Sequence, residues 1–412
     1  MTKKQLFALC LSNFAIFVVG TGALPLLPVY AAQLGAPPVV TGYYLAFCYI
    51  ALAAGTFFAG WLSDRFGRRR WWLALAGLLG IPVTVALGYV AAMWTLITLT
   101  ALLWFLGGVG LSSVNILVGL FAGNEKRGQA FGFLTLAMGA GTLTGGMITG
   151  PLVDAWGYTT MFALLSLFWV PVLVAVLFVQ DKPLTASQSG QTPATQPKTR
   201  LSKDFYLLFV ANLIGAAAGF VSILGRSLRM DFSGFTATAI SSTGAIAALV
   251  TLPVPLWVGS LSDRLGRKQF LILCYLTSAA GLAILSLSTS LWHFWIAVSV
   301  GQLSATIGGP VGQAMATDRL APESLGRGLS LYNTGGSIGA TIGFICTGYA
   351  IQGLGTTLTL IGGALLPLMA IILLIPVQRV SRMAKQSMDP AHIVQPVGKA
   401  PTAAMSRKAR RR

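Results

Sequence analysis

Long apolar segments, separated by short polar ones, fill most of this chain. The apolar segments are continuous and lack the alternation of apolar and polar positions that is typical of half-buried β-strands. A helix needs about 20 apolar residues to cross the roughly 30 Å hydrocarbon core of a bilayer. The pattern therefore predicts an all-α membrane protein with twelve transmembrane helices, near residues 5–31, 39–62, 71–91, 94–121, 128–151, 159–180, 204–225, 235–260, 268–288, 291–315, 327–350 and 356–378.

The composition agrees with a lipid environment. Of the 412 residues, 55% are hydrophobic and 9% are charged, whereas roughly a quarter of the residues of a soluble domain are charged. Too few charged side chains are present to cover a water-facing surface, which excludes a soluble fold. The cysteines lie in four different apolar segments without metal-ligand spacing, so we expect no metal and no cofactor: Cys10, Cys48, Cys274 and Cys346.

The basic residues have an uneven distribution along the chain. When the loops are assigned alternately to the two sides of the membrane, 26 of the 28 Lys and Arg residues fall on one side, and only Arg226 and Arg229 fall on the other. Basic loops stay in the cytoplasm, so we expect both termini to be cytoplasmic in a multi-pass plasma-membrane protein. The net charge of +18 therefore indicates membrane topology and contact with lipid, and no nucleic-acid partner is expected.

A sequence repeat divides the chain into two halves. The segment from Gly60 to Arg69 recurs from Gly259 to Lys268, 199 residues later, and similar offsets relate Asn13 to Asn212 and Gly150 to Gly348. Such parallel repeats are typical of transporters whose pathway lies between two halves. We expect a six-helix bundle over residues 1–180, a cytoplasmic linker over 181–203, a second six-helix bundle over 204–378 and a basic disordered tail over 379–412.

The repeated segment, Gly-x-Leu-Ser-Asp-Arg-x-Gly-Arg followed by Arg or Lys, resembles the signature loop of the major facilitator superfamily. The resemblance covers residues 1–380 and implies two pseudo-symmetric six-helix bundles that move against each other. In that family the loop forms a cytoplasmic charge network that latches the outward-open state. The resemblance assigns this gating role to Gly60, Asp64, Arg65, Gly67, Arg68, Asp263, Arg264, Gly266 and Arg267.

Two further segments resemble the drug:proton antiporter branch of that family, with departures. Gly22 to Pro28 is similar to the proline-bearing end of the first helix of these antiporters. The fifth segment matches the glycine signature of the branch in part, with Gly146 in the place of a proline, and Trp104 replaces the usual arginine of the fourth segment. Small residues four apart also allow close helix packing, so we interpret the glycine run first as a packing seam between the fifth and eighth helices.

The acidic residues leave proton coupling open. All ten Asp and Glu residues lie in loops or at the ends of predicted helices, so no carboxylate is expected in the middle of the membrane, where a proton carrier usually lies. The leading coupling candidate is Asp154, at the end of the fifth segment after Pro151. Its alternative role is that of a helix-end group with no part in coupling.

A pathway without fixed charge predicts a neutral or lipophilic substrate. The first, fourth, seventh and tenth helices line the cavity of the family that the chain resembles. The candidate substrate-binding residues are polar or aromatic side chains on the predicted helices: Asn13, Tyr49, Asn115, Asn212, Gln302 and Asn333. Each amide could instead join two helices by a hydrogen bond.

The sequence therefore predicts an alternating-access transporter that exports small lipophilic or neutral compounds as a monomer, with proton coupling undecided. The alternative is uptake or facilitated diffusion of a neutral sugar or metabolite. An enzyme is not expected, because the chain has no HExxH, phosphate-binding loop or GxSxG motif and contains only two histidines.

Overall fold

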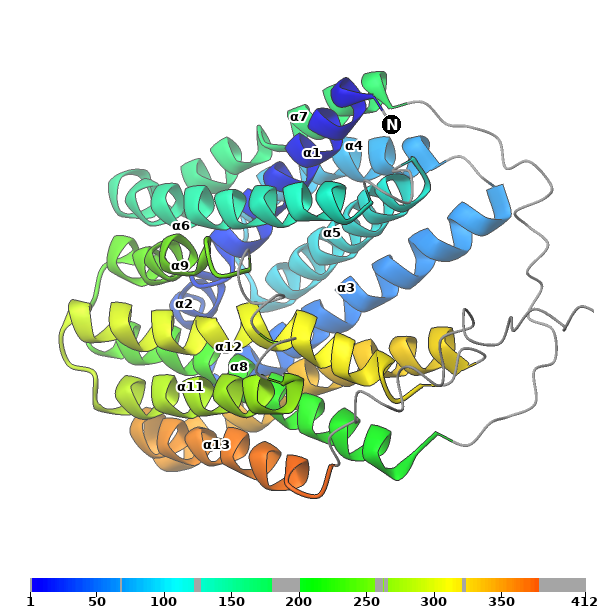
Figure 1. Cartoon of the computed structure of the whole chain (residues 1–412). Helices are drawn as coiled ribbons and strands as arrows, with labels where there is room; N and C mark the ends of the chain where they lie inside the picture. The colour runs from blue at the N-terminus through cyan, green and yellow to red at the C-terminus, as the bar shows by residue number, and fades with distance from the viewer. Residues whose placement is uncertain are drawn as a thin grey trace, which may run out of the picture. The chain divides into compact units, whose positions relative to one another are not determined.

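The computed structural model describes residues 2–66, 69–121, 127–179, 201–255, 262, 266–320 and 324–377, and helices make up nearly all of them (Figure 1). Residues 1–377 form one compact unit. The helices of the first half are α1 (Lys3–Ala23), α2 (Leu27–Gln33), α3 (Pro38–Phe66), α4 (Arg69–Leu87), α5 (Met93–Phe121), α6 (Arg127–Ser166) and α7 (Trp169–Phe178). The helices of the second half are α8 (Lys203–Phe232), α9 (Ala237–Thr251), α11 (Arg267–Leu287), α12 (Leu291–Thr317) and α13 (Leu325–Leu374).

These helices correspond to the twelve predicted segments. Within the described ranges, nine helices are long and apolar enough to cross a membrane. Two of the nine, α6 and α13, each contain two helices that meet at a non-helical glycine, Gly157 or Gly355. The apolar helix α9 is shorter, with 15 residues. Counting both parts of α6 and α13 and adding α9 gives twelve segments, which confirms the predicted all-α membrane fold.

The predicted first segment, 5–31, is broken rather than continuous. Helix α1 ends at Ala23, and α2 begins at Leu27 with Pro28 in its first turn. Proline has no N–H to donate and clashes with the preceding helical turn, but it fits the first turn of a new helix. Pro25 and Pro28 together therefore replace one straight helix with two.

Four glycines with left-handed backbone mark one end of the bundle, which we call the turn end. Their φ angles are +80° at Gly35, +77° at Gly157, +76° at Gly234 and +79° at Gly355. Only glycine adopts these angles without strain. Gly234 follows Gly35 by 199 residues and Gly355 follows Gly157 by 198, so each turn of the first half recurs in the second. The sequence repeat is therefore also a repeat of backbone conformation.

Helices α6 and α13 each have glycines on two faces. One face packs against a helix of the same half, and the other packs against a helix of the opposite half. On α6, a Cβ atom added to Gly145 would lie 2.5 Å from the carbonyl oxygen of Val18 in α1, and one added to Gly150 would lie 2.5 Å from that of Ala237 in α9. On α13, a Cβ atom added to Gly348 would lie 2.6 Å from the carbonyl oxygen of Pro38 in α3, and one added to Gly343 would lie 2.7 Å from that of Ala217 in α8. Each helix therefore packs against the first helix of its own half and the second helix of the other half. We call the contacts between halves the α6–α9 seam and the α13–α3 seam.

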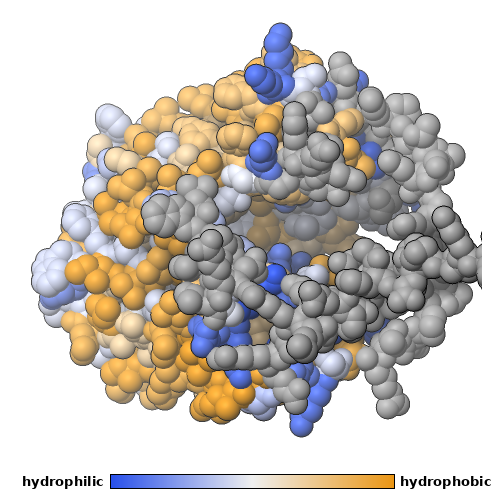
Figure 2. Space-filling view, viewed as in Figure 1, coloured by the Kyte–Doolittle hydropathy of each residue, from blue (hydrophilic) through white to orange (hydrophobic). Residues whose placement is uncertain are grey.

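The predicted packing seam between the fifth and eighth segments is thus confirmed. Gly146, which stands where the antiporter signature has proline, faces Ala245 and Ser241 of α9. Large apolar side chains also cover much of the outer surface, as Figure 2 shows on one face. Leu177 and Phe57, for example, are 80% and 78% exposed, which suits contact with lipid tails.

Candidate functional site

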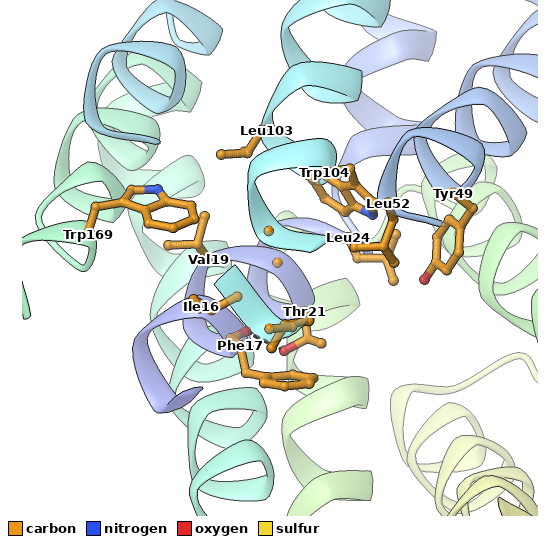
Figure 3. A pocket seen from close by; sticks show the side chains of 13 residues that line it. Ile16, Phe17, Val19, Thr21, Leu24, Tyr49, Leu52, Leu103, Trp104 and Trp169 are labelled. Atoms are coloured by element: carbon orange, nitrogen blue, oxygen red, sulfur yellow. Dashed lines mark hydrogen bonds between the residues drawn. The ribbon is translucent and has the colours of Figure 1, made fainter. Parts of the chain in front are cut away.

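A cavity of about 210 Å³ lies between helices α1, α3, α5 and α7 of the first half (Figure 3). Its wall is formed almost entirely by apolar and aromatic side chains. In Figure 3, Trp169 and Tyr49 lie on opposite sides of the group, with Ile16 and Trp104 between them. The lining residues are Ile16, Phe17, Val19, Gly20, Thr21, Leu24, Tyr49, Leu52, Leu103, Trp104, Gly107, Leu111 and Trp169.

Two aromatic side chains bring unpaired hydrogen-bond donors to this wall. Within the part of the chain that the structure describes, neither the indole N–H of Trp104 nor the hydroxyl of Tyr49 has a hydrogen-bond partner. Trp169 differs, because its indole N–H already donates to Thr84 Oγ1 at 3.0 Å. The cavity can therefore hold an apolar ligand that carries one or two hydrogen-bond acceptors.

The electrostatic character of this cavity depends on Trp104. None of the thirteen lining residues is charged, and Trp104 occupies the position where the antiporter signature has arginine. The side chain is 7% exposed, so an arginine here would bring a positive charge to a largely buried position. With tryptophan at this position, the wall of the cavity has no charged side chain.

Tyr49 connects the cavity to the second half. Its ring centroid lies 4.8 Å from that of Phe220 in α8 and 5.4 Å from that of Phe344 in α13. Of the six candidate binding residues, Tyr49 alone lines the described cavity. Three others are exposed elsewhere: Asn115, Gln302 and Asn333. The Asn333 Oδ1 atom accepts a hydrogen bond from Gln313 Nε2 at 3.0 Å.

Asn13 and Asn212 join helices in equivalent positions of the two halves. Asn13 Nδ2 donates to the carbonyl oxygen of Leu134 at 2.8 Å, and Asn212 Nδ2 donates to that of Tyr332 at 3.0 Å. The acceptors are 198 residues apart and the donors 199. Each bond fixes the first helix of a half to its fifth. These contacts favour the interhelical alternative over ligand binding.

We expect Asn13→Ala and Asn212→Ala to lower stability without changing substrate preference. Each removes one interhelical hydrogen bond, which contributes about 1 kcal/mol in membranes. Thermal unfolding in detergent should show a lower midpoint for both variants, and the rank order of transported compounds should stay the same. A change of that order in either variant would indicate ligand contact instead.

The described residues of the two copies of the gating motif make different contacts: Arg65 of the first copy contacts aromatic rings, and Arg267 of the second copy forms an ion pair. The guanidinium of Arg65 lies over the rings of Trp61 and Phe66, at 5.6 Å and 5.8 Å from their centroids, and Gly60 faces open space. In the second copy, Gly266 precedes α11 with φ +100°. Gly67, Arg68, Asp263, Arg264 and the side chain of Asp64 lie outside the described residues.

Arg267 fastens two helices of the second half to each other. Its Nη1 atom lies 2.6 Å from Asp318 Oδ2 and donates to the carbonyl oxygen of Ala314 at 2.8 Å. Asp318 caps the C-terminus of α12, so the contact joins the start of α11 to the end of α12. The ion pair lies within one half.

Asp154 caps a helix of the opposite half. Its Oδ1 atom accepts the backbone N–H of Ala237 at 3.0 Å, and its Oδ2 atom accepts that of Thr238 at 2.8 Å. The side chain of Thr236 accepts the N–H of Ala239. Together they satisfy three of the four N–H groups that the start of a helix leaves free, and the carboxylate also complements the positive end of the helix dipole. Asp154 is therefore part of the α6–α9 seam.

The same end of the bundle carries a second contact between the halves. The hydroxyl groups of Tyr43 and Tyr349 are 2.9 Å apart, and Gly42 lies against Gly348 and the carbonyl oxygen of Phe344. The two seams thus meet closely at the turn end. In this structure the two halves are therefore in contact at the turn end.

Sequence reasoning did not identify the main aromatic wall of the cavity. Phe17, Trp104 and Trp169 have the same apolar character as side chains that face lipid, and only the family position of Trp104 distinguished it. A signal that could have found Trp169 is its place deep in a segment, because tryptophans favour the ends of transmembrane helices.

Known transport proteins resemble this chain in sequence over most of its length. The curated relatives include Multidrug resistance protein MdtG of Proteus mirabilis, 27% identical over 364 residues, which covers 82% of this chain and 89% of the relative. They also include MdtG of Salmonella typhimurium, 27% identical over 307 residues, which covers 71% of this chain and 74% of the relative.

Solved structures share the fold at low identity. The nucleoside transporter NupG superposes with a TM-score of 0.75 at 13% identity and covers 91% of this chain and all of its own. A bacterial homologue of the human lysosomal transporter Spinster, in an inward-facing and occupied conformation, gives a TM-score of 0.72 at 14% identity, covering 92% of this chain and 98% of its own. The Major Facilitator Superfamily model matches residues 9–254 and 227–411, and the protein is therefore a member of the Major Facilitator Superfamily.

Proposed function

We propose that this protein exports small lipophilic compounds from the cell by alternating access, as a multidrug transporter. The observation that carries the proposal is the uncharged aromatic cavity between α1, α3, α5 and α7. Apolar walls with few polar groups are typical of sites for lipophilic ligands. The relatives named Multidrug resistance protein MdtG support the same function.

The cavity chemistry favours this function over transport of a sugar. A sugar presents many hydroxyl groups, and each one that is buried without a hydrogen bond is unfavourable. The cavity wall offers only the Tyr49 hydroxyl, the Trp104 N–H and the Thr21 hydroxyl as polar side-chain atoms. The Thr21 hydroxyl already donates to the carbonyl oxygen of Phe17 at 2.6 Å.

A growth-inhibition panel tests the proposal directly. Cells that express the protein should tolerate higher concentrations of several chemically unrelated lipophilic compounds than cells that do not. A variant with Gly150→Ala, which obstructs the α6–α9 seam, should remove that tolerance while remaining in the membrane. Unchanged tolerance to every compound, together with transport of a neutral sugar into vesicles, would support the alternative function.

We also propose that the protein is a monomer in the plasma membrane with both termini cytoplasmic. The distribution of 26 of 28 basic residues supports this orientation, which makes the turn end the outer end. The gating motif would then lie on the cytoplasmic side, where Asp64→Asn should slow transport more than Asp263→Asn. Cysteine labelling at residues 3, 190 and 400 should require permeabilised cells, and labelling of intact cells would contradict the orientation.

Asp154 is the proposed coupling site if protons drive transport. Its two oxygens accept the backbone N–H groups of Ala237 and Thr238 at the start of α9, an arrangement that favours the ionised carboxylate. Protonation would remove the charge that these N–H groups stabilise, so proton binding would favour release of the α6–α9 seam. Protonation of the Asp154 carboxyl would in this way be coupled to the opening of the turn end.

We expect Asp154→Asn to abolish transport driven by a pH gradient while downhill exchange continues. Asparagine keeps one acceptor for α9 but cannot carry a proton. Proteoliposomes with an imposed gradient would measure both activities, and Asp231→Asn on α8 is the matched control. Full gradient-driven accumulation by Asp154→Asn would eliminate it as the coupling site, and no response of the unmutated protein to the gradient would eliminate proton coupling.

A further inference from the structure

Two arginines near the turn end of α8 have opposite environments. Arg229 donates from Nε and Nη2 to the carbonyl oxygen of Ser288 and from Nη1 to Thr357 Oγ1. Arg226, one turn earlier, is 6% exposed, and its Nε atom is buried without a hydrogen-bond partner. Among the described residues, no hydrogen bond or ion pair involves the Arg226 side chain.

A buried guanidinium without a partner is an expensive feature. Removing a charged group from water is strongly unfavourable unless an opposite charge and hydrogen-bond acceptors replace the water. Arginine stays charged at any physiological pH because its pKa in water exceeds 12. A binding partner that is present only in part of the transport cycle would explain why this position holds an arginine.

The described acids near the turn end do not provide that partner. Both oxygens of Asp154 bind the N–H groups of α9. Asp231 lies five residues after Arg226 on the same helix, a spacing that places two side chains on different faces. Neither of these two acids therefore neutralises the charge of Arg226 in this structure.

The position of Arg226 relates it to the proposed exit route. Leu24 lines the cavity, follows the last residue of α1 and lies three residues before the start of α2. Leu26 and Val29 share one apolar cluster with Val221 and Met230 of α8, and α2 contacts α8. Val221 lies five residues before Arg226 in the sequence, and Met230 lies four residues after it. Phe220, which contacts the cavity residue Tyr49, precedes Arg226 by six residues, about 9 Å along the helix. Arg226 therefore lies in the stretch of α8 between the cavity and the turn end.

We infer that Arg226 binds an anionic group on the exported compound when the halves part at the turn end. This inference rests on the proposed export function and refines its substrate class. The preferred compounds would have an aromatic body that fits the uncharged cavity and a carboxylate or sulfonate that pairs with Arg226 during exit. A planar guanidinium suits both groups, because it donates two parallel hydrogen bonds to their oxygens.

A pair of probes that differ only in charge tests the inference. Naphthalenesulfonate is anionic, and naphthalenesulfonamide has the same ring system without the charge. Transport of each into inverted vesicles is compared for the unmutated protein, Arg226→Gln, Arg226→Lys and the control Arg229→Gln. We expect Arg226→Gln to reduce sulfonate transport about tenfold or more, the size expected for loss of a charged hydrogen bond, and to leave sulfonamide transport nearly unchanged. Arg226→Lys should retain part of the sulfonate transport.

Three results would overturn the inference while leaving the export function intact. Equal losses for both probes in Arg226→Gln would indicate a structural role. Transport of the sulfonamide but not the sulfonate by the unmutated protein would exclude anion recognition. The same loss in Asp231→Asn would indicate an internal ion pair in the other conformation. If the unmutated protein carries neither probe nor any other lipophilic compound, the proposed function itself fails, and the inference with it.

Discussion

Replacing Gly150 with alanine should stop transport although the protein still folds. A Cβ atom at this position would lie 2.5 Å from the carbonyl oxygen of Ala237 and 2.5 Å from Thr238 Cα. Both are backbone atoms of the first turn of α9, so no side-chain rotation can make room. Inserting atoms into a packed contact costs about 1–3 kcal/mol, which would shift the equilibrium away from the closed turn end by roughly 5-fold to 150-fold.

The matched control for this change lies on the same helix. A Cβ atom at Gly132 would meet nothing within 4 Å, so Gly132→Ala should transport normally. Gly150→Val should be at least as impaired as Gly150→Ala. Transport assays and thermal unfolding of all three variants would distinguish a blocked seam from a damaged fold. Normal transport by Gly150→Ala would mean that the seam has no part in the cycle.

Replacing Trp104 with arginine should abolish transport of neutral lipophilic compounds. The side chain is 7% exposed and borders a cavity without an acidic lining residue. An isolated buried charge costs several kcal/mol, and it would keep ordered water where an apolar ligand binds. We expect transport of neutral compounds to fall by about a hundredfold, which corresponds to about 3 kcal/mol.

Two companion variants separate charge from shape at this position. Trp104→Phe keeps an aromatic surface but lacks the N–H donor, so it should transport compounds without acceptor groups nearly as well as the unmutated protein. Trp94→Arg introduces the same charge at a 70% exposed position of the same helix and should have little effect. Initial transport rates for compounds with and without an acceptor would measure these differences. Equal rates for Trp104→Arg and Trp94→Arg would show that the cavity does not bind the substrate.

The features that could be predicted from the sequence are those that repeat. The offsets that relate Asn13 to Asn212 and Gly157 to Gly355 reappear as equivalent hydrogen bonds and equivalent turns. Hydrophobic length also predicted the helices, because a bilayer requires a minimum apolar span. Repetition and length are properties of the chain itself, which is why they can be read without coordinates.

The cavity and the buried arginine could not be predicted in the same way. Apolar residues face lipid, neighbouring helices or a cavity alike, so composition does not distinguish Trp104 from Trp94, although one lines the cavity and the other is exposed. The count of basic residues placed Arg226 and Arg229 together on one side of the membrane, but it contains no information on burial. Only the fold distinguishes Arg229, which has hydrogen-bond partners, from Arg226, which has none among the described residues.

The crossed packing of the fifth helices sets a rule for building chimaeras from this protein. Helix α6 of the first half needs a small-residue surface on α9, and α13 of the second half needs one on α3. Each half can therefore be exchanged only for one whose contact surface fits the remaining half. A chimaera with one half from a relative should function only if the donor also provides a glycine or alanine opposite Gly150 and opposite Gly348. The two halves therefore constrain each other's sequence at these positions, even among relatives that transport different substrates.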